Sequence, residues 1–289
     1  MAKEHFLTIL LAEEAMRPLE YSKNKEKKTM GTAQAQGELW GVQAQNWANL
    51  QEKMQLPAYK IVFDKTNVGR GTRLLDVGCG SGLAAQLAAK LGAYVTGIDA
   101  SKAELVIARE RVPAGDFRSG EMEELPYADA SFDVVTGFNS FQYAENPVNA
   151  LREARRVVKA GGYVAMVSWG RAEDCEHVAT FAAVMACVPP PPPGAESPFS
   201  LAEPGKIEAL MEQVGLTPQV SGDVSCPFEY PDDETAWKGI SSPGPLIGAI
   251  QYAGEDNIKK AILDSLVPYK TRNGGYRQEN SFRYVIATA

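Results

Sequence analysis

The sequence predicts an α/β protein with a mostly parallel sheet of seven strands flanked by helices. Between Arg73 and Trp169, short apolar runs alternate with helical segments, which is the pattern of parallel βαβ units. The first of these runs leads into three alternate glycines, Gly78, Gly80 and Gly82, and then into a helix. The 289 residues allow one large domain or two ordinary ones. The composition, 45% hydrophobic and 22% charged, is that of a globular protein.

The predicted elements follow one another in a regular order. Strands are expected at 73–77, 94–98, 116–120, 133–137, 163–169, 220–228 and 282–287. Helices are expected at 83–91, 102–111, 148–159, 176–187 and 204–215, with more between 233 and 269, and one or two over 38–63 before the sheet. Ser101 and Glu104 predict a capping box at the helix over 102–111. Pro204 is expected early in its helix and Gly215 just past the end.

Charge and hydropathy argue against nucleic-acid binding and membrane insertion. The chain holds 29 Lys and Arg against 36 Asp and Glu, a net charge of −7, whereas nucleic-acid binders usually carry a basic surface. No apolar run approaches the ~18 residues that span a bilayer. Glu13 and Glu14 follow the first apolar block, where a signal peptide would carry small residues. We therefore expect a cytoplasmic protein without membrane contact.

Cysteine and histidine positions predict neither a metal site nor a disulfide framework. The four cysteines are scattered and form no C-x-x-C pair. They are Cys79, Cys175, Cys187 and Cys226. His5 and His177 are the only histidines, so a multi-histidine metal cluster is ruled out. We expect reduced, mostly buried thiols and no bound metal.

The glycine-rich turn after the first strand predicts a nucleotide-type site. Glycines let the backbone turn tightly and approach a ligand with free N–H groups. Asp76 adds a carboxylate at the end of this strand, and Asp99 ends the second strand, where an acid can accept both hydroxyls of a ribose. In a dinucleotide fingerprint counted from Gly78, the last glycine would fall at Leu83. The spacing therefore disfavours a standard dehydrogenase.

Further motifs follow in the order of a known family. The segments 120–127 (GEMEELPY) and 153–162 (EARRVVKAGG) come after the glycine turn and Asp99. Together these motifs resemble class I S-adenosylmethionine-dependent methyltransferases, of the small-molecule group that includes the ubiquinone and menaquinone pathway enzymes. The resemblance spans about residues 73–169. It implies a Rossmann-like fold, S-adenosylmethionine as cofactor, and in-line transfer of a methyl group to an acceptor.

The resemblance also implies roles for particular residues. The loop from Asp76 to Gly80 would wrap the methionine part of the cofactor, and Asp99 would bind the ribose. Glu121 would face the adenine amino group and the backbone of Met122 the adenine ring, although the family has Asp and Ala at these two positions. The cofactor-binding residues implied in this way are Asp76, Gly78, Cys79, Gly80, Asp99, Ala100, Glu121, Met122 and Asn139. The segment 155–162 is implied to be structural.

Other side chains are candidates for the sulfonium and the acceptor. Trp40, Trp47 and Tyr59 could cover the sulfonium, because an aromatic face attracts a cation, but helix packing is favoured as the role of two of the three. His177 and Tyr143 are candidates for a general base if the acceptor must lose a proton.

The change in composition at Met30 and the resemblance together suggest four parts of the chain. We expect an N-terminal extension over 1–29, helices over 30–70 that cover the cofactor, and a cofactor-binding core over 71–170. Elements over 171–289 would supply the acceptor cap and the last strands, and their aromatic residues favour a small, partly apolar organic acceptor. The proline run at 189–193 favours a stiff extended loop over a docking ligand for a proline-binding module.

Alternatives remain open at this stage. A nicotinamide-dependent oxidoreductase would use the same glycine turn, and a non-catalytic relative would keep the cofactor site without turnover. DNA is disfavoured as a substrate, since residues 139–142 read Asn-Ser-Phe-Gln and not the Asn/Asp-Pro-Pro-aromatic motif of the amino-DNA methyltransferases. The oligomeric state is expected to be a monomer or homodimer.

Overall fold

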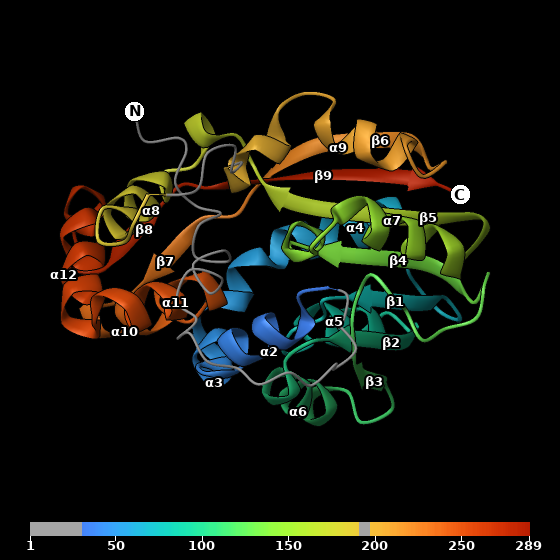
Figure 1. The fold of residues 1–289 in the computed structure, drawn as a ribbon, viewed down its shortest axis with the longest axis horizontal. Coiled ribbons are helices and arrows are strands. Elements are labelled where there is room, and N and C mark those ends of the chain that lie inside the picture. The colour runs from blue at the N-terminus through green and yellow to red at the C-terminus, as the bar shows by residue number, and fades with distance from the viewer. Residues whose placement is uncertain (1–30, 191–196) are drawn as a thin grey trace, which may run out of the picture.

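A seven-stranded sheet forms the centre of the molecule in the computed structural model, which describes residues 31–190 and 197–289. The predicted extension over 1–29 and the last three residues of the proline run lie outside the described residues. The strand order is β3 (Asp116–Ser119), β2 (Tyr94–Asp99), β1 (Arg73–Val77), β4 (Phe132–Phe138), β5 (Val158–Trp169), β9 (Ser281–Thr288) and β6 (Thr217–Ser225). β9 runs antiparallel between β5 and β6, and the first five strands pair in parallel (Figure 1). The predicted mostly parallel, seven-stranded sheet is confirmed.

Helices cover both faces of this sheet. One face packs against α4 (Leu56–Lys65), α5 (Leu83–Lys90) and α6 (Lys102–Arg111), and the other against α7 (Pro147–Val157) and α9 (Lys206–Glu212). Successive side chains of β1 point to opposite faces of the sheet, because side chains alternate along a strand. Leu74 belongs to the core under α4 and α5, and Leu75 to the core under α7 and α9. The sheet is thus buried on both faces, as parallel sheets are.

The chain before β1 changes its helix type several times. It forms α2 (Ala33–Gly41), α3 (Ala44–Asn46), the π-helical η1 (Trp47–Gln51), the 3₁₀ turn η2 (Glu52–Gln55) and then α4. The expectation of one or two helices here was therefore wrong in number. Pro57 lies in the first turn of α4 and does not interrupt it, since a missing backbone N–H is tolerated at a helix start.

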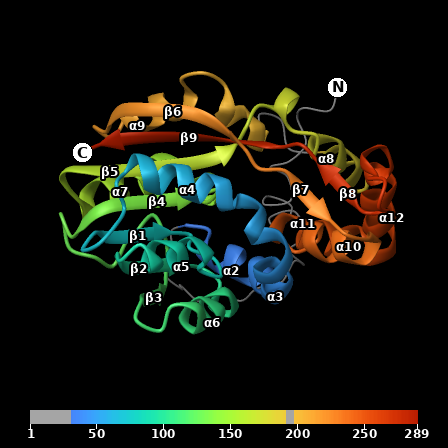
Figure 2. The same cartoon turned by 180° about the vertical axis from the view of Figure 1, so that it is seen from behind.

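A second group of elements lies at one end of the sheet. It consists of α8 (Val178–Met185), α10 (Asp233–Ile240), α11 (Gly244–Ala253), α12 (Glu255–Leu266) and the two-stranded ribbon of β7 (Phe228–Tyr230) and β8 (Tyr276–Gln278). Figure 2 shows this group beside the carboxyl ends of the parallel strands, where α11 packs on α2 and α10 on η1. Short 3₁₀ turns complete the described chain at η3 (Phe141–Tyr143), η4 (Ala172–Asp174), η5 (Pro198–Ala202) and η6 (Val267–Tyr269).

Several predicted boundaries need correction. The helix expected over 148–159 ends at Val157, and the strand expected over 163–169 already begins at Val158. The strand expected over 220–228 is two elements, because β6 ends at Ser225 and Phe228 belongs to the separate ribbon. The helix expected from Pro204 starts at Lys206, after Gly205 in a left-handed conformation, so the proline precedes the helix. Gly215 follows that helix with φ +79° and confirms the expected end. Among residues 31–190 and 197–289, no helix has both the length and the apolar character needed to cross a membrane.

Candidate functional site

A cavity opens at the carboxyl ends of β1, β2 and β4. Helix α2 covers it from one side, and the turn after β3 closes another. Seven of the nine predicted cofactor residues line it, and these are Gly78, Gly80, Asp99, Ala100, Glu121, Met122 and Asn139. Ligands of open α/β sheets bind at this edge, so the position is that of a cofactor site.

The glycine turn is fixed by its neighbours. Gly78 has φ +70°, and a Cβ at this position would lie 2.4 Å from the Cβ of Ser140. The N–H groups of Gly78 and Cys79 donate to the carbonyl of Ile98. Gly80 has φ +51° and donates its N–H to Asp99. Only glycine fits the turn at Gly78 because both the backbone angle and the packing exclude a side chain.

Asp99 organises the turn as well as lining the cavity. Its Oδ2 accepts from the N–H of Gly80 and its Oδ1 from the N–H of Ser101, each at 2.8 Å. Burial raises the pKa of Asp99, and the backbone N–H donors oppose that shift. The carboxylate therefore joins the end of β2 to the glycine turn.

Asp76 and Cys79 do not line the cavity. Asp76 is only 2% exposed and accepts a hydrogen bond from the Thr136 hydroxyl at 2.8 Å. Burial raises the pKa of Asp76 to about 7. The Cys79 thiol is buried next to Gly97 in the core. Both side chains support the turn from behind, which leaves only backbone atoms there to approach a ligand.

A buried acidic cluster behind the glycine turn was not predicted. Glu104 lines the cavity, accepts a hydrogen bond from the Ser81 hydroxyl through Oε2, and leaves its buried Oε1 without a partner. Burial raises the pKa of Glu104 to about 9. Glu52 accepts from the N–H of Leu83 and pairs with Arg111.

Only one of the two hydrogen bonds of the predicted capping box forms, because the Glu104 side chain bonds Ser81. The Ser101 hydroxyl accepts from the N–H of Glu104 at 3.3 Å, but the carboxyl group of Glu104 turns to Ser81 and not to the N–H of Ser101. The spacing therefore located the helix start correctly. The capping interpretation gave no indication that Glu104 lines the cavity. The only signal in the sequence was a carboxylate five residues after Asp99.

Glu121 ties helix α2 to the turn after β3. Its Oε2 accepts from the N–H of Ala33 at 2.9 Å, and its Oε1 from the N–H of Glu123 at 3.1 Å. The Thr32 hydroxyl donates to the carbonyl of Tyr143 at 2.6 Å. Both carboxylate oxygens of Glu121 thus already hold backbone groups, in addition to lining the cavity where an adenine contact is expected.

Close packing of α2 against the end of β2 depends on Gly37. A Cβ at Gly37 would lie 2.4 Å from the carbonyl oxygen of Ala100, which also lines the cavity. We expect Gly37→Ala to push α2 outward and to weaken S-adenosylmethionine binding roughly tenfold in calorimetry, since overpacking costs about 1 to 3 kcal/mol. Gly41→Ala is the matched control on the same helix, because its nearest contact would be 3.4 Å. Equal affinities of the two variants would contradict the packing argument.

Two of the three predicted aromatic residues line the cavity. Trp40 and Trp47 meet edge to face with ring centroids 5.1 Å apart, and Trp40 meets Tyr143 at 5.7 Å. Tyr59 is buried and packs 4.6 Å from the ring of Phe138, so it belongs to the core. Helix packing was expected for two of the three residues, whereas both tryptophans line the cavity and Tyr59 alone does not.

A second, smaller cavity adjoins the first. Five residues line both cavities, and they are Trp40, Trp47, Gln55, Asn139 and Tyr143. Asn139 has φ +54°, and its side-chain oxygen accepts from Gln142 at 2.5 Å. His177, one of the two candidate bases, lines only the second cavity, whereas Tyr143 lines both. In the described part of the chain, no group of three or more His, Cys, Asp or Glu side chains could hold a metal ion.

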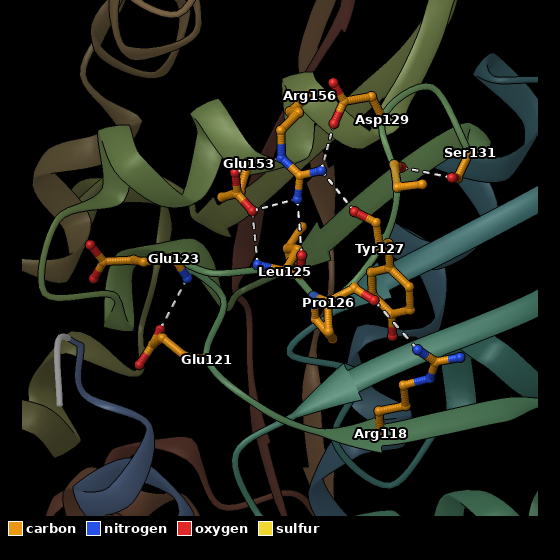
Figure 3. A network of polar contacts seen from close by, with 11 residues as sticks. Arg118, Glu121, Glu123, Leu125, Pro126, Tyr127, Asp129, Ser131, Glu153 and Arg156 are labelled. Atoms are coloured by element: carbon orange, nitrogen blue, oxygen red, sulfur yellow. Dashed lines mark hydrogen bonds and ion pairs between the residues drawn. The ribbon is translucent and has the colours of Figure 1, made fainter.

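Arg156 fixes the segment that follows Met122. The Arg156 guanidinium donates to the carbonyls of Leu125 and Tyr127, at 2.9 and 2.7 Å. It also pairs with Glu153 and Asp129 (Figure 3). Glu153 also accepts from the N–H of Leu125 at 2.8 Å. Its pairing with Arg156 lowers the pKa of Glu153. These contacts support the structural role implied for the 155–162 motif.

We expect Arg156→Met to lower the free energy of unfolding by about 1.5 kcal/mol, because hydrogen bonds to charged groups contribute about 1.5 to 3 kcal/mol and this guanidinium is partly exposed. Urea denaturation at pH 7 measures the change. Arg152→Met is the matched control on the same helix, where the exposed arginine bonds only Asn149 three residues before it. An equal loss of unfolding free energy in the two variants would contradict a stabilising role of the Arg156 contacts.

The fold and the site define the class of protein that the chain resembles. Residues 75–166 match the family model of the methyltransferase domain. The YcgJ protein of Bacillus subtilis has the same fold, with a TM-score of 0.54 at 20% identity over 80% of this chain and 97% of that chain. The architecture is the class I Rossmann-like methyltransferase fold, and the predicted resemblance is confirmed.

Two relatives of this chain are named for the methylation of small molecules. The ubiquinone biosynthesis O-methyltransferase of Maricaulis maris is 34% identical over 154 residues, which are 51% of this chain and 59% of that enzyme. The 27-O-demethylrifamycin SV methyltransferase of Amycolatopsis mediterranei is 32% identical over 169 residues, 54% of this chain and 57% of the relative. The chain spans less than two thirds of the length of these relatives.

Proposed function

We propose that the protein is an S-adenosylmethionine-dependent methyltransferase that acts on a small, partly apolar organic acceptor. The observation that carries the proposal is the acidic lining of the first cavity, together with its lack of a cationic side chain. Asp99, Glu104 and Glu121 line it beside two tryptophan rings, and none of its described lining residues is Lys or Arg. Such a cavity suits a sulfonium and an ammonium group. It does not suit the pyrophosphate of a nicotinamide dinucleotide, which counts against the oxidoreductase alternative.

Unpartnered polar atoms support the same fit. Gln36 Nε2, Gln55 Oε1 and Glu104 Oε1 are buried without hydrogen-bond partners, and all three side chains line the first cavity. Buried polar groups are normally paired, so these atoms are suited to a polar ligand. Asp99 would accept the ribose hydroxyls, and the backbone around Gly78 and Gly80 would contact the methionine part. Bound S-adenosylmethionine supplies an electrophilic methyl group.

The protein's own contribution would be alignment of the two reactants. Trp40, Trp47, Gln55, Asn139 and Tyr143 line both cavities, so the methyl group is expected at this junction. A nucleophile in the second cavity could then approach it in line, with its translational freedom already lost on binding. We extend the proposal to a cytoplasmic enzyme, monomeric or homodimeric, that does not act on nucleic acid, in keeping with its net charge of −7.

Isothermal titration calorimetry tests the cofactor assignment. The purified full chain is titrated with S-adenosylmethionine, S-adenosylhomocysteine and NAD⁺. We expect micromolar binding of the two sulfur compounds and none of the dinucleotide. Preferential binding of NAD⁺ would favour an oxidoreductase. Binding of S-adenosylmethionine with no methyl transfer to any hydroxyl, amine or thiol acceptor would favour a non-catalytic relative.

A further inference from the structure

The second cavity has a mostly apolar lining without charged side chains, in which Gln51, Gln55 and Asn139 supply amide groups. The rings of Trp169, Phe181 and Phe228 line it together with Ile240 and Leu246. No Lys, Arg, Asp or Glu belongs to its described lining. A charged acceptor would lose its hydration there without gaining a counterion, which is costly. Flat apolar rings pack favourably against the aromatic side chains.

His177 is held in this wall in one tautomer. Its Nδ1 lies 2.8 Å from the side-chain oxygen of Gln278. The amide nitrogen of Gln278 lies 3.2 Å from the Thr180 hydroxyl and 3.5 Å from the backbone carbonyl oxygen of Glu176. Because that carbonyl can only accept, the amide oxygen is the atom that faces Nδ1. Nδ1 must therefore carry the proton, and Nε2 keeps a lone pair. The backbone N–H of His177 also donates to Asn280 at 3.0 Å.

Aromatic rings surround the imidazole. It stacks on Trp169 at an interplanar angle of 6°, and its centroid lies 4.7 Å from that of Phe181 and 5.2 Å from that of Phe228. Burial lowers the pKa of His177 to about 4. The imidazole is thus neutral at physiological pH, and its lone pair is available to accept a proton.

We infer that the second cavity binds an uncharged aromatic molecule with a hydroxyl group, and that Nε2 of His177 accepts the hydroxyl proton. This inference rests on the proposed function. The acceptor oxygen forms a bond to the methyl carbon while the carbon–sulfur bond breaks and leaves its electron pair on sulfur. The O–H proton passes to Nε2, and the imidazolium later releases it to water. An oxygen that is being methylated becomes strongly acidic, so a weak base is sufficient.

Tyr143, the other candidate base, is less suited to this step. Burial raises the pKa of Tyr143 above its usual value. A phenol that stays protonated can donate a hydrogen bond but has no basic lone pair comparable to that of imidazole. Tyr143 would therefore orient the acceptor at the junction of the two cavities.

Nuclear magnetic resonance tests the tautomer without any acceptor. The chain has only two histidines, so His5→Asn leaves the signal of His177 alone in a long-range ¹H–¹⁵N spectrum. We expect a neutral ring with protonated Nδ1 at pH 7, and a shift of the proton toward Nε2 in Gln278→Leu. A charged ring, or a proton on Nε2, in the parent protein would overturn the assignment.

Turnover with a matched pair of probes tests the substrate class and the base. With saturating S-adenosylmethionine, release of S-adenosylhomocysteine is followed with 2-naphthol and with 2-naphthoate. We expect methylation of the naphthol alone. In His177→Asn, which can keep the hydrogen bond to Gln278, we expect kcat to fall at least about 100-fold, as loss of a general base does. The Kd for S-adenosylmethionine should stay unchanged, and His5→Asn serves as the control.

The outcomes separate this inference from the proposed function. Failure of the parent protein to bind S-adenosylmethionine would refute the cofactor assignment itself. If the cofactor binds, the inference alone fails on any of three results: no methylation of the naphthol, equal methylation of the naphthoate, or full kcat in His177→Asn. A Kd change in that variant equal to its loss of kcat would indicate a structural role for His177.

Discussion

Asp99→Ala is expected to weaken S-adenosylmethionine binding about 10- to 150-fold, which corresponds to the ~1.5 to 3 kcal/mol of hydrogen bonds to a charged group. The carboxylate holds the N–H groups of Gly80 and Ser101, and it is the acid expected to bind the ribose. Its loss would therefore remove ligand contacts and loosen the glycine turn together. Calorimetry with S-adenosylmethionine measures the change.

Two further variants define the origin of this effect. Asp99→Asn keeps the size of the side chain and one carbonyl oxygen, so its loss of affinity should be smaller. Asp116→Ala removes an exposed carboxylate from the neighbouring strand β3 and should leave the Kd unchanged. An unchanged Kd in Asp99→Ala, with a melting temperature close to that of the parent, would overturn the ribose assignment.

Glu104→Gln is expected to stabilise the ligand-free protein at alkaline pH. The folded pKa of Glu104 is raised to about 9 from an ordinary value of 4.5. The folded state therefore holds a proton that the unfolded state releases. The stability that depends on this proton is complete below about pH 4.5 and is lost progressively as the pH rises toward 9. A neutral amide of the same shape escapes this loss.

The advantage of Glu104→Gln over the parent should grow by at least about 1.4 kcal/mol between pH 5 and pH 8, the free energy of one pKa unit. Urea denaturation at the two pH values measures it. Glu110→Gln, an exposed position on the same helix, should show no such growth. An equal advantage at both pH values would mean that Glu104 is ionised in the folded protein.

Local sequence patterns predicted the sheet with few errors. β1 and α6 have the predicted bounds, and β2, β3 and β4 lie within one residue of theirs at each end. β5 begins at Val158, five residues before its predicted start. Their apolar runs, the glycines and the cap at Ser101 depend on neighbours close in sequence. Errors arose where contacts between distant segments determine the backbone conformation. One example is the run of helix types from α2 to α4, which lines the cavity and packs against α10 and α11.

The sequence alone determined the class of fold, the glycine turn and the acid at Asp99, because backbone angles, side-chain alternation and turn chemistry are properties of short segments. Only the tertiary structure decided which side chains share a cavity. It separated Tyr59 from the two tryptophans, placed Glu104 in the cofactor cavity, and paired His177 with Gln278 across 101 residues. Burial and hydrogen bonding between distant segments set these groups' protonation, and no local pattern encodes that.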